Sequence, residues 1–259
     1  MEALDLEPRR DLAEVLGLAW RLLRAYLAVF LALALVAVTP VVLLVNGVWG
    51  GALADVQARP SQGAQLASGL LNLFLVTPLV TATHVVAVQD LARGAAPAVG
   101  RSLRVLLGAA PPLLAAAVLY ALGTILGSFL LLLPAVWFAI RCFFAPHAVL
   151  VEGRGGTDAL RRSAALVRGC WWRTFGSLLA GGLLAALLAV AVALVLGIPA
   201  ALTESGALLV AATILASALG YAYTALVGVL LFFDLRVRRG DVPGEQRESA
   251  GAPDAPISR

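Results

Sequence analysis

The segment TFGSLLAGGLLAALLAVAVALVLGI, Thr174–Ile198, decides the fold class of this chain. It carries no charged residue, and it is longer than the roughly 20 residues that a helix needs to cross the hydrocarbon layer of a membrane. Its Leu, Ala and Val residues follow one another without the alternation typical of a β-barrel strand. Because backbone groups in lipid must be bonded within their own segment, this pattern predicts a transmembrane helix.

Runs of the same kind occur elsewhere in the chain. The six predicted spans are Ala25–Val48, Leu66–Val88, Val105–Gly123, Gly127–Ala145, Thr174–Ile198 and Ala207–Phe233. The third and fourth come from one stretch that has no charge before Arg141 and is too long for one span. We expect Gly123, Gly127 and Ser128 to form the tight turn between them. A single long span followed by a re-entrant segment is the alternative.

The composition excludes an ordinary soluble protein. Hydrophobic residues make up 61% of the chain and charged residues 13%, against roughly half and a quarter in globular domains. The mean hydropathy is +0.94. We therefore expect an all-α, polytopic membrane bundle of six transmembrane helices in residues 1–239. Residues 240–259, rich in Gly, Pro, Ser and charge, predict a disordered cytoplasmic tail.

The arginines predict the orientation. All 19 basic residues are arginine, and on the six-span assignment only Arg59 lies in an odd-numbered connection. Since basic residues near spans stay on the cytoplasmic side, both termini are expected inside. The high isoelectric point, about 9.7, then reflects arginines that meet anionic headgroups, and it requires no nucleic-acid partner.

A short amphipathic helix is expected before spans one, three and five, in the membrane interface. The three predicted apolar faces are Leu12, Leu16, Ala19 and Leu23; Val99, Leu103, Leu106 and Ala110; and Leu160, Ala164, Val167 and Trp171. The second and third units also share residues in register: Arg101 with Arg162, Ser102 with Ser163, and Gly108 with Gly169. The chain is therefore predicted to repeat an interfacial helix plus a transmembrane hairpin three times.

Two polar segments carry the most distinctive residues. The first runs from Arg141 to Phe175 and the second closes the sixth span at residues 231–241. Their motif residues are Arg141, Pro146, Glu152, Ala159-Leu160, Ser163 and Gly169, then Asp234 and Arg236. With Glu14 and Ala19-Trp20-Arg21-Leu22 near the start, this pattern resembles the glycerophosphoryl diester phosphodiesterase membrane domain family, over about Leu12 to Arg239. The resemblance implies a six-span protein of the bacterial plasma (inner) membrane. No phosphodiesterase barrel is present in the sequence, so the enzymatic half of the family name does not apply.

The motif residues suggest two roles. In one, Arg141, Glu152, Arg161, Arg162, Asp234 and Arg236 form a site for a lipid headgroup or another substrate, because guanidinium groups match phosphate geometry. In the other, Glu152 and Asp234 pair with neighbouring arginines and lock helix ends at the interface.

Span two is the most polar of the six. Thr77, Thr81 and His84 are a candidate polar pathway, in which His84 would titrate. The alternative is that the threonine hydroxyls bond the helix backbone and that His84 lies near the inner interface.

Two function classes follow. The first is a non-catalytic membrane module that interacts with membrane lipids, with a membrane-protein partner or with a second copy of itself, in membrane or envelope maintenance. The second is a small permease or export component. The sequence contains no Gly-x-Ser-x-Gly, HExxH or Walker motif, and Cys142 and Cys170 lie outside any metal-binding spacing. We therefore expect no enzyme activity, cofactor or metal.

Overall fold

The computed structural model describes residues 4–51, 53, 61–130 and 132–241. These residues form helices and contain no β-strand. Within these residues, six helical segments are long and apolar enough to cross a membrane, which confirms the all-α, six-span prediction. They are Leu27–Trp49, Gln62–Ala92, Ala110–Phe129, Leu132–Glu152, Trp171–Leu202 and Gly206–Arg238. Most of the predicted tail, residues 240–259, lies outside the described residues.

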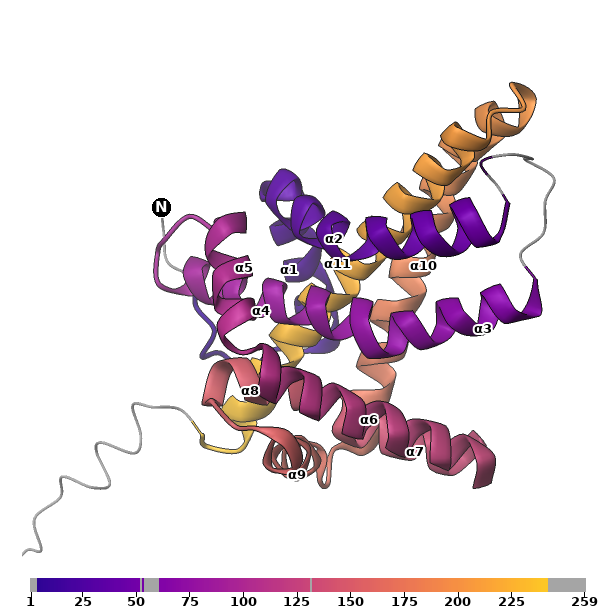
Figure 1. Ribbon diagram of the computed structural model, residues 1–259. Coiled ribbons are helices and arrows are strands. Elements are labelled where there is room, and N and C mark those ends of the chain that lie inside the picture. The colour runs from indigo at the N-terminus through magenta and orange to yellow at the C-terminus, as the bar shows by residue number, and fades with distance from the viewer. Residues whose placement is uncertain (1–3, 52, 54–60, 131, 242–259) are drawn as a thin grey trace, which may run out of the picture.

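The spans are built from the following elements (Figure 1). The first consists of α2 (Leu27–Val42) and η1 (Leu43–Trp49), and the second of α3 (Gln62–Leu71), η2 (Asn72–Val76) and α4 (Thr77–Ala92). The third is α6 (Ala110–Leu130), and the fourth joins α7 (Leu132–Cys142) to α8 (Ala145–Glu152). The last two are α10 (Trp171–Leu202) and α11 (Gly206–Arg238). Three short helices, α1 (Leu12–Ala25), α5 (Val99–Gly108) and α9 (Gly156–Val167), precede spans one, three and five.

The second span contains a widened turn in its middle. Pro78 has no N–H, and a proline ring crowds the carbonyl four residues before it. The chain passes through the π-helical turn η2 immediately before this proline. Asn72 begins that turn, and its side-chain oxygen accepts a hydrogen bond of 2.8 Å from the hydroxyl of Tyr221 on α11. Spans two and six are thus joined by a polar contact inside the bundle.

The turn predicted between spans three and four is wrong in position. Gly123, Gly127 and Ser128 lie within α6, which continues to residue 130, and α7 begins at Leu132. The two glycines are sites of close approach instead: a Cβ at Gly123 would lie 2.3 Å from the Phe138 ring, and one at Gly127 would lie 2.9 Å from the Ala135 Cα. Small residues allow membrane helices to pack this closely. The third span accordingly starts at Ala110, since Val105 belongs to α5, and it forms a hairpin with the fourth.

The short helices occupy the three predicted positions, but their buried sides differ in part from the predicted faces. In α1 the buried residues include Ala19 and Leu23, as expected, together with Val15 and Leu22. In α5 the buried residues are Ser102 and the expected Leu106. In α9 they are Ala159, Ser163, Leu166 and the expected Val167. Ala110 and Trp171 belong to the spans that follow. Placement of these helices in the membrane interface stays a prediction.

Helix α11 forms the centre of the bundle. Its residues Leu226, Leu230 and Leu231 are fully buried, and the helix packs against α1, α2, α4 and α10. In contrast, α10 is exposed along much of its length, including Leu187 and Val195 at 65% and 70%. In a membrane these side chains face lipid, since no other described element covers them.

The described ends of the chain lie at the same end of the bundle. Arg10, ahead of α1, contacts Asp234 and Arg238 near the end of α11. The ends of α4, α8 and α11 and the helices α5 and α9 also lie at this end, whereas the α6–α7 and α10–α11 turns point away from it and from one another (Figure 1). We call it the arginine-rich end. An even number of spans brings the two ends of the helical region together in this way.

Candidate functional site

A buried carboxylate joins three helices at the arginine-rich end. Asp234 of α11 is fully buried. Its Oδ1 accepts a bond of 2.8 Å from the backbone N–H of Arg10, and its Oδ2 accepts bonds from Arg238 at 2.8 Å and Arg173 at 3.3 Å. The backbone oxygen of Arg10 in turn accepts from Arg173 and Arg238, at 2.6 and 2.8 Å. Asp234 therefore fixes the entry to α1 against α10 and α11.

A second carboxylate, Glu152, ends α8. The helix stops there because Gly153 takes the left-handed conformation, with φ 67°. Arg162 donates two hydrogen bonds to Glu152, from Nε to Oε2 at 2.8 Å and from Nη2 to Oε1 at 2.9 Å. Nε of Arg236 lies 3.4 Å from Oε1, and Asp241 contacts Arg162 at 2.8 Å.

The pKa of Arg162 reflects its contacts with these acids. Burial alone would lower the pKa of the guanidinium. The hydrogen bonds to Glu152 and Asp241 outweigh that effect and raise the pKa above its ordinary value. The positive charge of Arg162 is thus matched inside the protein by two carboxylates.

A third acid repeats the arrangement. Asp90, buried at the end of α4, lies 3.2 Å from Nε of Arg101 on α5. An acid near the end of each hairpin thus contacts a short helix or its entry. For α4 and α8 this is the helix that follows, α5 and α9, whereas for α11 it is the entry to α1, the first helix of the chain. The Asp90–Arg101 pair was not among the predicted site residues, although the shared register of Arg101 and Arg162 could have indicated it.

Ser163 strengthens the second of these contacts. Its hydroxyl donates to the backbone oxygen of Arg141 at 2.9 Å and accepts from the backbone N–H of Phe144 at 3.0 Å. Both backbone groups lie at the α7–α8 junction, where the helical hydrogen-bond pattern is interrupted. Ser163 therefore bonds backbone groups on both sides of the α7–α8 break. Ser102, at the matching position of α5, is equally buried.

The six predicted site residues do not form one site. Glu152, Arg162 and Arg236 meet at the end of α8, and Asp234 lies in the separate cluster with Arg173 and Arg238. Arg161 is exposed on α9 and contacts only the exposed Asp158 among the described residues, at 3.4 Å. Arg141 lies on α7 with its guanidinium 4.6 Å from the centroid of the Trp137 ring.

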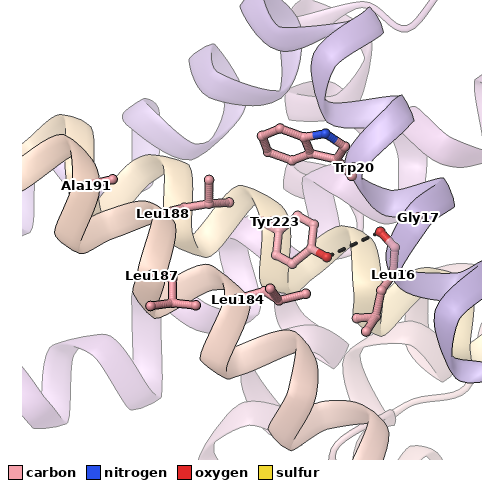
Figure 2. A pocket seen from close by; sticks show the side chains of 8 residues that line it. All are labelled: Leu16, Gly17, Trp20, Leu184, Leu187, Leu188, Ala191 and Tyr223. Carbon is pink, nitrogen blue, oxygen red and sulfur yellow. Dashed lines mark hydrogen bonds between the residues drawn. The ribbon is translucent and has the colours of Figure 1, made fainter.

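An apolar groove opens on one side of α10. Leu16, Gly17 and Trp20 of α1 form one wall, residues of α10 form the other, and Tyr223 of α11 forms the floor (Figure 2). The α10 wall consists of Leu184, Leu187, Leu188 and Ala191. Its volume is about 440 Å³. The Tyr223 hydroxyl donates to the backbone oxygen of Leu16 at 3.2 Å, so the polar atom of the floor is occupied within the protein.

A second apolar groove lies between α7 and α10. Leu133, Pro134, Val136 and Trp137 line one side, and Trp171 and Trp172 line the other. The indole nitrogen of Trp171 donates to the backbone oxygen of Trp137 at 3.4 Å, which joins the two walls. The groove encloses about 680 Å³. Rings of tryptophan prefer the boundary between hydrocarbon and headgroups, so this groove would lie at that depth.

The two grooves share one feature. In each, an arginine four residues after a tryptophan lies over its ring: Arg24 is 6.0 Å from the Trp20 centroid, and Arg141 is 4.6 Å from that of Trp137. Residues four apart in a helix lie on the same face. In the described parts of the chain, neither arginine forms an ion pair with an acid. One tryptophan of each groove thus lies against an arginine that no described acid neutralises.

The polar residues of span two separate into two places. Thr77 and Thr81 line a cavity of about 150 Å³ between α4, α8 and α11, together with His147, Tyr221 and Thr224. His84 lies elsewhere: it stacks on Phe30 at 5.3 Å, and its Nδ1 lies 2.8 Å from the backbone oxygen of Val80. His147, which the sequence reading did not select as a site residue, takes its place in the cavity.

Both cysteines of the sequence lie in the part of the chain that the structure describes. Cys142 and Cys170 are free thiols. Within that part of the chain, no three His, Cys, Asp or Glu side chains gather where they could hold a metal ion.

The comparisons with known proteins add one match. Residues 113–234 are similar to a family described as a domain of unknown function, DUF7847. The match spans less than half of the chain and contains the α7–α10 groove, Glu152, Arg162 and Asp234, but not α1 to α4. No curated protein and no solved structure matches the chain. The resemblance to the glycerophosphoryl diester phosphodiesterase membrane domain family stays a prediction, and the structure and the match together describe a helical membrane protein that contains a domain of unknown function.

Proposed function

We propose that this protein is a non-catalytic membrane module that binds anionic phospholipids in the two grooves beside α10. The observation that carries the proposal is the pair of Trp–Arg contacts, Trp20 with Arg24 and Trp137 with Arg141, each at an apolar groove. A role in membrane or envelope maintenance would follow from such binding. The family resemblance implies the plasma membrane of a bacterium, and the arginine distribution favours both termini in the cytoplasm.

The length and exposure of α10 support acyl chains as the occupants of the grooves. Its 32 residues extend about 48 Å at 1.5 Å per residue, more than the roughly 30 Å of hydrocarbon. Exposed apolar residues continue from Leu179 to Leu202. An acyl chain that packs into either groove lies alongside this helix and is covered on two sides.

The charges support an anionic headgroup. A cation–π contact leaves the charge of an arginine in place, and the guanidinium fork matches the geometry of a phosphate. Arg162 and Arg236 differ, because Glu152 already lies against both. We therefore assign the clusters of Glu152 and Asp234 to locking helix ends, and we assign the headgroup contacts to Arg24 and Arg141.

The test uses tryptophan fluorescence in vesicles. The full chain is reconstituted in phosphatidylcholine containing a small fraction of brominated phosphatidylglycerol or, in parallel, brominated phosphatidylcholine. Because bromine quenches only nearby indoles, we expect stronger quenching by the anionic lipid. The Arg24→Gln plus Arg141→Gln variant should lose most of that preference.

The matched control is Arg104→Gln plus Arg161→Gln. It removes the same charge from exposed positions on α5 and α9, outside both grooves. It should retain the preference for phosphatidylglycerol. Equal losses in the two double variants, or equal quenching of the unchanged protein by both lipids, would contradict the proposal.

A small permease or export component is the second candidate. One observation favours it: Thr77 and Thr81 of span two line a cavity inside the bundle. Transport would require this cavity to open toward both faces, and solute flux into vesicles that contain the purified protein measures it. Flux that is abolished by Thr81→Val, with lipid preference unchanged, would favour transport.

A further inference from the structure

We propose that the cavity beside His147 is a binding site for a small uncharged molecule, about the size of one aromatic ring and carrying a hydroxyl or N–H group. The proposal does not depend on lipid binding, since none of the residues that line this cavity lines either groove. It rests on the volume of the cavity, on its polar groups and on the absence of charge in its described wall.

His147 is the principal polar group. Its side chain is 1% exposed, and in the described residues neither ring nitrogen has a hydrogen-bond partner. Aromatic rings hold it in place, with Phe232 stacked at 5.4 Å and Phe144 edge-on at the same distance. Buried polar atoms are normally bonded, so an unbonded imidazole at a cavity indicates a ligand. A neutral imidazole offers one donor and one acceptor.

The other histidine, His84, differs from His147 in its hydrogen bonding. His84 is also fully buried, but its Nδ1 lies 2.8 Å from the carbonyl oxygen of Val80 and its ring stacks on Phe30. That histidine has one nitrogen satisfied by its own helix and does not line the cavity. His147 has both nitrogens free for a molecule beside it.

The remaining wall defines the chemical class of the ligand. Thr77, Thr81, Tyr221 and Thr224 line the cavity together with apolar side chains and Gly228. The Tyr221 hydroxyl donates to Asn72 and the Thr224 hydroxyl donates to the backbone oxygen of Gly220, so both can still accept a bond but neither donates to the cavity. No acidic or basic side chain other than the histidine lines it, and an unpaired ion in such surroundings is strongly unfavourable. The volume, about 150 Å³, is close to that of a protein cavity known to accept benzene. A phenol-like molecule meets all three conditions.

A substitution at Gly228 can test whether the ligand occupies this cavity. A Cβ at this position would lie 3.4 Å from Nε2 of His147 and 3.1 Å from the ring of Phe143. Alanine there would therefore add a methyl group beside His147 and reduce the space in the cavity. Gly182 on α10 is a matched glycine, because a Cβ there meets nothing within 4 Å.

The experiment measures binding of 4-fluorophenol and of fluorobenzene to the purified full chain in detergent by ¹⁹F NMR. Competition with unlabelled phenol isolates the saturable component. We expect saturable binding of 4-fluorophenol, at least tenfold weaker in His147→Phe, which keeps a ring but removes both nitrogens. Fluorobenzene should bind less tightly than 4-fluorophenol to the unchanged protein, and His147→Phe should remove that difference.

The glycine variants locate the site. Gly228→Ala should weaken 4-fluorophenol binding severalfold, and Gly182→Ala should leave it unchanged. Absence of saturable binding, equal affinity for the two probes, or unchanged binding in His147→Phe would each overturn the proposal. Circular dichroism confirms that each variant is folded, and His147→Phe decides the result if Gly228→Ala does not fold. Failure here leaves the lipid preference at α10 unaffected, so the two proposals can fail separately.

Discussion

The arginines of this protein exist in two environments. At the ends of α8 and α11, Arg162, Arg173 and Arg238 contact carboxylates that are largely or fully buried. Beside α10, Arg24 and Arg141 lie over tryptophan rings and have no acidic partner among the described residues. The same kind of side chain is thus neutralised by a carboxylate in one place and lies against an aromatic ring without a described acidic partner in the other. Arginine content alone does not distinguish these roles; the neighbouring acid does.

Among the variants that test this difference, the largest loss of stability is expected at Asp234. Asp234→Ala removes the acceptor of three hydrogen bonds from Arg10, Arg173 and Arg238. Removing one partner of a buried pair costs about 3–5 kcal/mol, so the free energy of unfolding in mixed micelles should fall by about 3 kcal/mol or more. Asp158→Ala is the control, because its partner Arg161 is exposed and surface pairs contribute about 1 kcal/mol or less. Similar losses in both variants would show that Asp234 does not lock the helix ends.

A smaller loss is expected at Glu152. Glu152→Gln keeps the size of the side chain but replaces the charged contact with Arg162 by a neutral one. Hydrogen bonds to charged groups contribute about 1.5–3 kcal/mol, and equilibrium unfolding in mixed micelles should show a loss of about 2 kcal/mol. Unchanged stability would mean that Arg236 and Asp241 hold the cluster without Glu152.

The smallest effect on the fold is expected at Arg141. Arg141→Gln removes the contact with Trp137, and exposed cation–π contacts contribute about 0.5–1 kcal/mol. Unfolding without lipid should change by no more than that. Added phosphatidylglycerol should stabilise the unchanged protein more than the variant, because a ligand stabilises only the state that binds it. A large loss without lipid, with the lipid response retained, would place Arg141 among the structural arginines.

Several features could be read from the sequence. The charge-free runs give six spans because hydrocarbon excludes charge and requires internally bonded backbone. The register between Arg101 and Arg162 indicated equivalent positions in two units, and the structure places an acid against each of them. Glu152 and Asp234 were selected as candidate residues, and both are found in ion-pair clusters.

Other features depended on which helices pack together. Glycines such as Gly123 and Gly127 are typical of turns, but in the structure they lie within α6 and allow α7 to pack closely against it. Contacts between segments far apart in the chain place Arg141 away from Arg162 and leave Arg24 and Arg141 without a described acidic partner. They also decide that His147, and not the predicted His84, lines the cavity.

The sequence by itself determined that the chain is a bundle of six apolar helices with arginines gathered at one end, because solvation acts on each segment independently of its neighbours. Only the tertiary structure decided which arginines meet a carboxylate, which histidine faces a cavity and which apolar surfaces stay uncovered. Those properties depend on distances of a few ångströms between different helices, and helical periodicity fixes the face of a residue without fixing the partner of that face.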